Sequence, residues 1–195
     1  SIGMWLVYHY QLRLEPGNNF GTEKETASQM MSLFILLGIA FIVKSLLASV
    51  MEGHGTDVGC FTAWSDMVYE NGITKFYHLD AFTDYPPGYM YILYFTAAFR
   101  KLFGIEAGSG IGVYLIKLVP ILCDLAAGYV IYKIARKRFS QGSSLFLCGC
   151  YVLNPLVVLD SSFWCQVDSV FTLTVLLMCY LFMEKKRILA YFVFA

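Results

Sequence analysis

Two short stretches decide how this chain folds: residues 55–64, GTDVGCFTAW, and residues 84–89, DYPPGY. They bound a polar segment between long hydrophobic segments, so we expect this segment at a membrane surface. The pair Pro86-Pro87 fixes the start of the next hydrophobic run. The carboxylates of the segment are Asp57, Asp66, Glu70, Asp80 and Asp84. This concentration of acids makes the segment the expected site of chemistry.

The composition is that of a polytopic membrane protein. Hydrophobic residues make up 58% of the 195 residues and charged residues only 14%, against about 25% charged residues in an average soluble domain. The formal net charge is zero, which gives no reason to expect a nucleic-acid partner. The cysteines fall mostly in hydrophobic runs and show neither zinc-type CxxC pairs nor a disulfide pattern.

Hydrophobic runs near the required length of about 20 residues predict the membrane-spanning helices. We expect spans at 30–51, 111–134, 145–159 and 170–183, and a further run begins at 188. Residues 88–103 are short for a full span, so their crossing is left open. The predicted organisation is an N-terminal segment and linker at 1–29, followed by one transmembrane domain at 30–195. Because that domain ends inside a hydrophobic run, we interpret it as truncated.

The polar segment is predicted to contain interfacial helices. Apolar residues recur at helical spacing from 58 to 71, and Gly72 is the stop signal. This pattern indicates an amphipathic helix on the membrane surface, with Trp64 and Tyr69 at the interface. Residues 73–83 are expected to form a second interfacial segment.

Basic clusters predict the orientation in the membrane. Residues 136–138 and 185–187 are expected on the cytoplasmic side, which places the turn at 164–168 outside. Asp57 is also expected outside if residues 11–29 are cytoplasmic. Both expectations hold only if residues 88–103 do not cross fully, or if one loop departs from the charge rule.

Charged residues inside the predicted spans need partners or a route to the surface. Lys44 either snorkels to the nearby interface or pairs with a phosphate or carboxylate inside the bundle. Lys117 and Asp124 lie on one face of a single helix. They form an ion pair with each other or with another helix, or Lys117 neutralises a lipid-linked phosphate.

Polar residues near the predicted helix ends have both a structural and a functional interpretation. Asp57 is a general base or a metal ligand, or it caps the helix that follows. Asp84 caps the helix after the proline pair, or it has a functional role. Trp164, Gln166 and Asp168 form a compact turn that binds sugar hydroxyls or starts the next helix.

Over residues 30–195 the chain resembles the N-terminal half of the membrane-embedded GT-C glycosyltransferases. It is similar in particular to dolichyl-phosphate-glucose-dependent glucosyltransferases and to bacterial relatives of the protein O-mannosyltransferases. The ordered motifs that carry the resemblance are GTD at 55–57, Trp64, DYPP at 84–87, Lys117 with Asp124, Asn154-Pro155 and WCQVDS at 164–169.

The resemblance implies an all-α transmembrane helix bundle of GT-C type, with interfacial helices in the first external loop. It implies a polyprenyl-phosphate sugar as the donor and Asp57 as the catalytic residue. The DYPP element maps to 84–87 and the WGQxD element to 164–168, with Cys165 where glycine is usual. The expected substrate-binding residues are Asp84, Lys117, Trp164, Gln166 and Asp168.

The predicted function is therefore that of an inverting glycosyltransferase. It transfers a hexose from a polyprenyl-phosphate donor to a hydroxyl of a glycan, protein or lipid on the external face of the membrane. The expected location is a bacterial plasma membrane, with the endoplasmic reticulum as the alternative, and a divalent cation is left open as a cofactor. A transporter or flippase, with Lys44, Lys117 and Asp124 along its path, is the second hypothesis, and a non-catalytic membrane subunit is the third.

Overall fold

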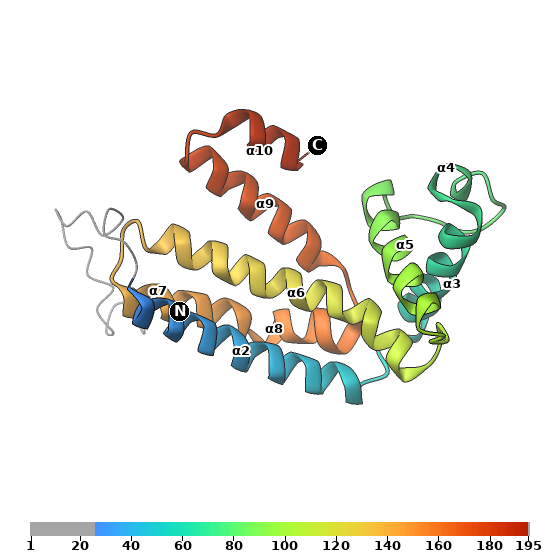
Figure 1. Ribbon diagram of the computed structural model, residues 1–195, viewed down its shortest axis with the longest axis horizontal. Coiled ribbons are helices and arrows are strands. Elements are labelled where there is room, and N and C mark those ends of the chain that lie inside the picture. The colour runs from blue at the N-terminus through green and yellow to red at the C-terminus, as the bar shows by residue number, and fades with distance from the viewer. Residues whose placement is uncertain (1–25, 195) are drawn as a thin grey trace.

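The computed structural model describes residues 26–194, and helices are the only regular elements in that range (Figure 1). The predicted all-α bundle is confirmed. The elements of the bundle are α2 (Ala27–Val50), α6 (Gly110–Ala135), α7 (Gln141–Val152), α8 (Pro155–Val158), the π-helix η1 (Leu159–Trp164), α9 (Asp168–Met183) and α10 (Arg187–Phe194). Helices α2 and α6 are long and apolar enough to cross a membrane. Residues 1–25 of the expected N-terminal segment lie outside the described residues.

The predicted span at 145–159 is wrong as a single straight helix. Helix α7 ends at Val152, and the α8–η1 segment continues after a bend of 47°. Pro155 lacks the backbone N–H that a continuous helix needs, and the side-chain oxygen of Asn154 accepts a hydrogen bond from the Leu156 N–H at 2.9 Å. The pair α7 and α8–η1 therefore forms one broken span or a re-entrant segment.

Helices α3 (Gly55–Asn71), α4 (Ile73–Phe76) and α5 (Pro87–Leu102) form a lobe at one end of the bundle, where α2 ends and α6 begins (Figure 1). Gly72 ends α3 as predicted, with a φ of 79° that favours glycine. Helix α5 runs steeply across the direction of α2 and α6, and it is not among the helices long and apolar enough to span. The turn after η1 lies at the same end of the bundle as α3, because the His54 N–H, just before α3, bonds the Trp164 carbonyl.

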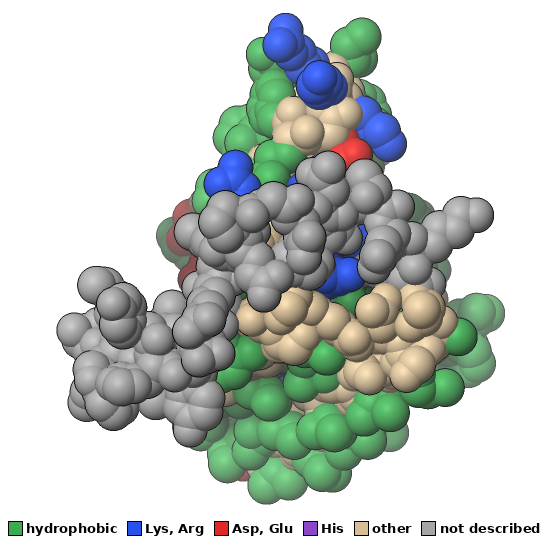
Figure 2. Space-filling view, turned by 90° about the vertical axis from the view of Figure 1, so that its left-hand side faces the viewer, with side chains coloured by type: hydrophobic (Ala, Val, Ile, Leu, Met, Phe, Trp, Pro, Cys, Tyr) green, Lys and Arg blue, Asp and Glu red, His purple; other side chains and the backbone are tan. Residues whose placement is uncertain are grey.

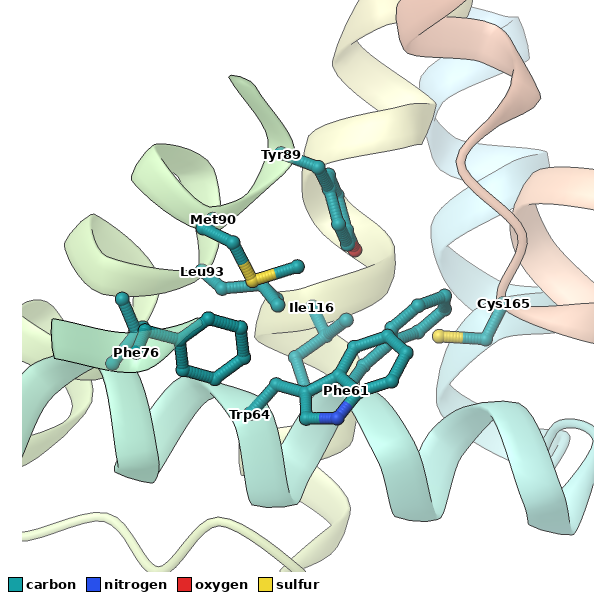
Figure 3. Packing of buried hydrophobic residues seen from close by; sticks show 9 residues of the cluster. Phe61, Trp64, Phe76, Tyr89, Met90, Leu93, Ile116 and Cys165 are labelled. Carbon is teal, nitrogen blue, oxygen red and sulfur yellow. The ribbon is translucent and has the colours of Figure 1, made fainter. Parts of the chain in front are cut away.

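A hydrophobic cluster joins this lobe to the bundle (Figure 3). Its buried members are Phe61, Trp64, Val68, Phe76, Tyr89, Met90, Leu93, Ile116 and Cys165. Trp64 is only 4% exposed and donates its indole N–H to the Phe82 carbonyl at 2.9 Å, so its side chain packs inside the lobe rather than on its surface. Because Ile116 belongs to α6 and Cys165 follows η1, the cluster fixes the lobe against the elements that carry the candidate site.

The basic clusters at 136–138 and 185–187 lie at the opposite end of the bundle. Lys137, just after α6, forms an ion pair with Glu184, just after α9. Figure 2 looks onto this end and shows Lys and Arg side chains gathered in its upper part. The two basic clusters thus share one end and the site shares the other, which is the arrangement that the charge rule requires when α5 does not cross.

A buried ion pair crosses the bundle. Lys44 Nζ lies 2.7 Å from Asp124 Oδ2, and both side chains are fully buried. The snorkelling of Lys44 is therefore wrong, and the carboxylate partner inside the bundle is confirmed. The partner of Asp124 is Lys44 of α2 and not Lys117 of its own helix. The Lys117 ammonium instead bonds the Met51 carbonyl at the end of α2. An unpaired charge at this depth would cost several kcal/mol, which explains why both ions are matched.

Candidate active site

Asp57 is held by two hydrogen-bond donors and by the close approach of a histidine ring, which come from both sides of the site. It lies in the first turn of α3, where His54 is the N-cap residue, so the alternative of Asp57 as the cap is wrong. Its Oδ2 accepts hydrogen bonds from Trp164 Nε1 at 2.7 Å and from Gln166 Nε2 at 2.9 Å. His54 Nδ1 lies 2.9 Å from the same oxygen. Within the described part of the chain, Oδ1 has no hydrogen bond, and 25% of the side chain is exposed.

Trp164 is the last residue of η1, and Gln166 lies in the turn that follows; both contact this carboxylate. Cys165 adopts a left-handed conformation, with φ 74° and ψ 36°, in which glycine is the favoured residue. The Gln166 N–H donates to the Asp160 carbonyl at 3.0 Å and closes the turn. The left-handed residue reverses the chain after the π-helix, so the side chains on both sides of it converge on Asp57. Cys165 takes this left-handed conformation although it carries a side chain.

Sequence reasoning assigned no role to His54. Its ring stacks on the Trp164 indole, with a centroid separation of 5.1 Å and an interplanar angle of 22°. Its backbone N–H donates to the Trp164 carbonyl at 3.1 Å. His54 and Trp164 are therefore joined both by a backbone hydrogen bond and by stacking of their rings. The available signal was the placement of His54 three positions before Asp57, which brings the two side chains together at a helix start.

Tyr85 extends the network into the lobe. Its hydroxyl donates to Gln166 Oε1 at 3.1 Å, which leaves the amide N–H₂ of Gln166 to face Asp57. Burial raises the pKa of Tyr85, and the neighbouring carboxylates, Asp57 first, raise it further. The hydroxyl therefore stays protonated and remains a donor. The DYPP motif contributes this tyrosine to the site, a role that the sequence interpretation did not assign.

Lys117 lies behind the site and is fully buried. Its Nζ donates to the carbonyl of Met51 at 2.6 Å and to that of Ala48 at 3.5 Å. These carbonyls are at the C-terminal end of α2, which has no basic residue of its own in its last turn. Lys117 therefore completes the hydrogen bonding of this helix end and fixes the start of the loop that leads to His54.

Asp84 and Asp168 are exposed, and neither caps a helix. Pro86 is the N-cap of α5, and no side chain caps it. Asp168 is the first residue of α9, after the N-cap Val167, and no side chain caps that helix either. The capping alternative is therefore wrong for Asp84. For Asp168 the predicted helix start is confirmed, although its side chain makes no cap. Asp168 instead lines a cavity of about 250 Å³ together with Asp160 and Thr172. A second cavity, of about 480 Å³, lies beside Glu52 and Gly53 at the end of α2.

Two cysteines adjoin the site, and the surroundings of both favour the protonated thiol. Burial raises the pKa of Cys165 to about 12. Burial also raises the pKa of Cys60, to which Asp84 and then Asp57 add. Both thiols therefore stay protonated near neutral pH. In the described part of the chain, no three His, Cys, Asp or Glu side chains are grouped so as to hold a metal ion.

The helices and the site define a membrane protein with a restrained carboxylate at one end of its bundle. The family model for dolichyl-phosphate-mannose-protein mannosyltransferase matches residues 84–195, more than half of the chain. The chain therefore belongs to this family, and it is an integral membrane glycosyltransferase of GT-C type. No curated protein and no solved structure matches it. Asp57 and His54 precede the matched residues, whereas Tyr85, Trp164 and Gln166 lie within them.

Proposed function

We propose that this protein transfers a hexose from a polyprenyl-phosphate donor to an acceptor hydroxyl, with inversion at the anomeric carbon, and that Asp57 is the general base. The observation that carries the proposal is the one-sided restraint of Asp57. Trp164, Gln166 and His54 hold Oδ2, while Oδ1 faces no protein donor in the described residues. A carboxylate oriented in this way is ready to accept a proton from a bound hydroxyl.

The proposed step is a single displacement. The acceptor oxygen attacks the anomeric carbon as its proton moves to Oδ1 of Asp57. The bond between this carbon and the phosphate oxygen breaks, and its electron pair leaves with the lipid phosphate. A glycosidase needs a second carboxyl group as general acid, but a phosphate monoester leaves without that protonation. One carboxylate is therefore enough for this chemistry.

The leaving phosphate needs favourable electrostatics, and the site suggests how Lys117 contributes. Its ammonium is bonded to the carbonyls of α2, so a direct contact with the phosphate would require these bonds to break. We therefore assign Lys117 a role in fixing the loop before His54. Its charge also offsets the negative potential of the site from behind. His54 is 49% exposed and is the better-placed group to meet an anionic donor.

Sugar recognition is proposed for the polar residues around Asp57. Trp164 is 46% exposed, and its indole offers a flat face at the mouth of the site. Gln166 bridges Asp57 and Tyr85, and Asp168 lines the cavity of about 250 Å³ nearby. Carboxylate and amide groups bind sugar hydroxyls through short hydrogen bonds. Asp84 is proposed as an outer contact because it is exposed near Tyr85.

The proposed orientation places this site on the external side of the membrane. Both basic clusters lie at the other end of the bundle, which the charge rule assigns to the cytoplasm. The acceptor hydroxyl is then part of an external glycan, protein or lipid. We further propose that residues 30–195 act as one membrane domain, in a bacterial plasma membrane.

The transporter hypothesis is not favoured, because the charged groups of its proposed path are already bonded to other groups of the protein. Lys44 and Asp124 form a fully buried pair, and Lys117 binds backbone carbonyls. A transport path needs polar groups that meet the substrate near mid-membrane. The polar groups proposed to meet the substrate instead lie around Asp57, at one end of the bundle.

The test is transfer of radiolabelled hexose from a panel of polyprenyl-phosphate sugars, in membranes that carry the full-length protein. Wild type is compared with Asp57→Asn at matched expression. The control is Asp80→Asn, because Asp80 is an exposed carboxylate of the same lobe without a contact to the site. Loss of transfer in the first variant only supports the proposal. Equal transfer by both variants removes Asp57 from catalysis.

A further inference from the structure

We propose that Lys44 is a positioning residue that holds the π-helix η1 in the register that brings Trp164 and Gln166 to Asp57. The inference rests on the proposed role of Asp57. It adds a residue far from the reacting atoms that acts through the segment on which the site is built.

All three N–H donors of the Lys44 ammonium are used inside the bundle. One bonds Asp124 Oδ2 of α6 at 2.7 Å. The other two bond the carbonyl of Val157 at 3.2 Å and the hydroxyl of Ser161 at 3.1 Å. An ammonium group offers three donors, so Lys44 is saturated by α6 on one side and by the α8–η1 segment on the other.

The segment that Lys44 contacts has an irregular backbone. Pro155 removes an N–H at its start, and the segment then changes from α-helical to π-helical at Leu159. Val157 and Ser161 stand on the two sides of this change, and the Ser161 hydroxyl donates to the Val157 carbonyl at 3.0 Å. Lys44 bonds both groups and thereby fixes the point at which the register changes.

The helical register of η1 at Ser161 determines where Trp164 lies, because both residues belong to this element. Trp164 lies three residues further along the same π-helix. Its indole N–H binds Asp57 and its carbonyl binds the His54 N–H. A rotation or shift of η1 would move both groups together. Asp124 secures the other side of the network, because it also accepts a hydrogen bond from the Tyr151 hydroxyl of α7 at 3.3 Å.

The chain offers a matched pair of variants for the test. Ser161→Ala removes the hydroxyl that binds Lys44 and leaves the Lys44–Asp124 ion pair intact. Ser162→Ala makes the same change at the next position, where the side chain is equally buried. Its hydroxyl has no hydrogen-bond partner among the described residues, so it is the control.

Two quantities are measured on the full-length protein. The first is kcat and KM for hexose transfer. The second is the ¹⁹F NMR resonance of Trp164 in protein labelled with 5-fluorotryptophan, assigned by its loss in Trp164→Phe. We expect Ser161→Ala to lower kcat about 10-fold, to leave KM for the donor unchanged and to shift the Trp164 resonance. Ser162→Ala is expected to match wild type in both measurements.

A second variant keeps the proposal testable if single changes unfold the protein. Lys44→Met combined with Asp124→Leu removes both charges and leaves neither ion unpaired. The folded double variant is expected to show the same shift of the Trp164 resonance and at least as large a loss of kcat. A double variant with wild-type kcat and an unmoved resonance would overturn the proposal, because the pair would then serve stability alone. Equal effects of Ser161→Ala and Ser162→Ala would overturn it as well.

The two readouts also separate this inference from the proposed function. If Asp57→Asn leaves transfer intact, the catalytic role of Asp57 fails, while the shift of Trp164 by Ser161→Ala still reports the contact with Lys44. If Asp57→Asn abolishes transfer but Ser161→Ala leaves the Trp164 resonance in place, only the positioning role fails.

Discussion

The indole nitrogen of Trp164 lies 2.7 Å from Oδ2 of Asp57, although 107 positions separate the two residues in the chain. This bond joins the start of α3 to the end of the broken helix. The GTD and WCQVD motifs thus each supply one side of the candidate site. A contact of this kind is short enough to be charge-assisted, which makes its removal measurable.

We predict that Trp164→Phe lowers hexose transfer by about 10-fold or more, because a hydrogen bond to a charged group contributes about 1.5–3 kcal/mol. Phenylalanine keeps a ring beside His54 and loses only the indole N–H. The measurement is kcat/KM in detergent or in membranes. The control is Trp64→Phe, which removes an indole N–H that binds a carbonyl of the lobe instead. A smaller effect at Trp164 than at Trp64 would contradict the assignment.

We predict that Gly53→Ala destabilises the protein by about 1–3 kcal/mol, whereas Gly55→Ala does not. Gly53 has a φ of 90°, and an added Cβ would lie 2.7 Å from Val58 Cγ2. The same addition at Gly55 meets nothing within 4 Å. The measurement is thermal unfolding of both variants in detergent. Gly53 also precedes His54, so its variant should lose transfer at temperatures where it is still folded.

We predict that Lys44→Met and Asp124→Leu each destabilise the protein by about 3–5 kcal/mol, because each leaves one buried ion without its partner. The double variant should recover most of this loss. Unfolding by heat or denaturant in detergent gives the three values. Additive losses in the double variant would show that the two side chains are not energetically coupled.

We predict that the lobe loop and the loop after α5 lie on one side of the membrane. Asp80→Cys and Glu106→Cys, in a background without the native cysteines, should both react with an impermeant maleimide added to one side. Arg138→Cys should react only from the other side. All three positions are exposed, so access depends on the membrane alone. Opposite labelling of positions 80 and 106 would mean that α5 crosses.

The sequence predicts the helices well because their signals are local. The spans at 30–51 and 111–134 differ from α2 and α6 by at most a few residues, and Gly72 ends α3 where its backbone freedom is needed. Asn154 and Pro155 were visible as well. Their effect was missed because a helix that restarts after proline keeps the same hydrophobic pattern as an unbroken one.

The partners of the site residues are not local, and sequence reasoning missed most of them. Lys44 and Asp124 are 80 positions apart, so no periodicity links them. Tyr85 was regarded only as part of a proline motif, although its hydroxyl reaches Gln166. Tryptophan is common at the membrane interface, so the sequence indicated that position for Trp64. The structure shows its side chain buried in the hydrophobic cluster of the lobe. Such outcomes depend on how helices pack and not on their own pattern.

The buried ion pair has a consequence for how this protein is made. The chain is inserted into the membrane from its N-terminal side, so Lys44 enters the bilayer before the ribosome has synthesised Asp124. During that interval α2 carries an ammonium group with no counterion, at a cost below the about 2.5–3.5 kcal/mol of a helix centre, because Lys44 lies in the C-terminal third of α2. The strong hydrophobicity of the remainder of α2 offsets this cost. Lys44 therefore gains its counterion only after α6 has been synthesised, and its bonds to Val157 and Ser161 only after α8 and η1.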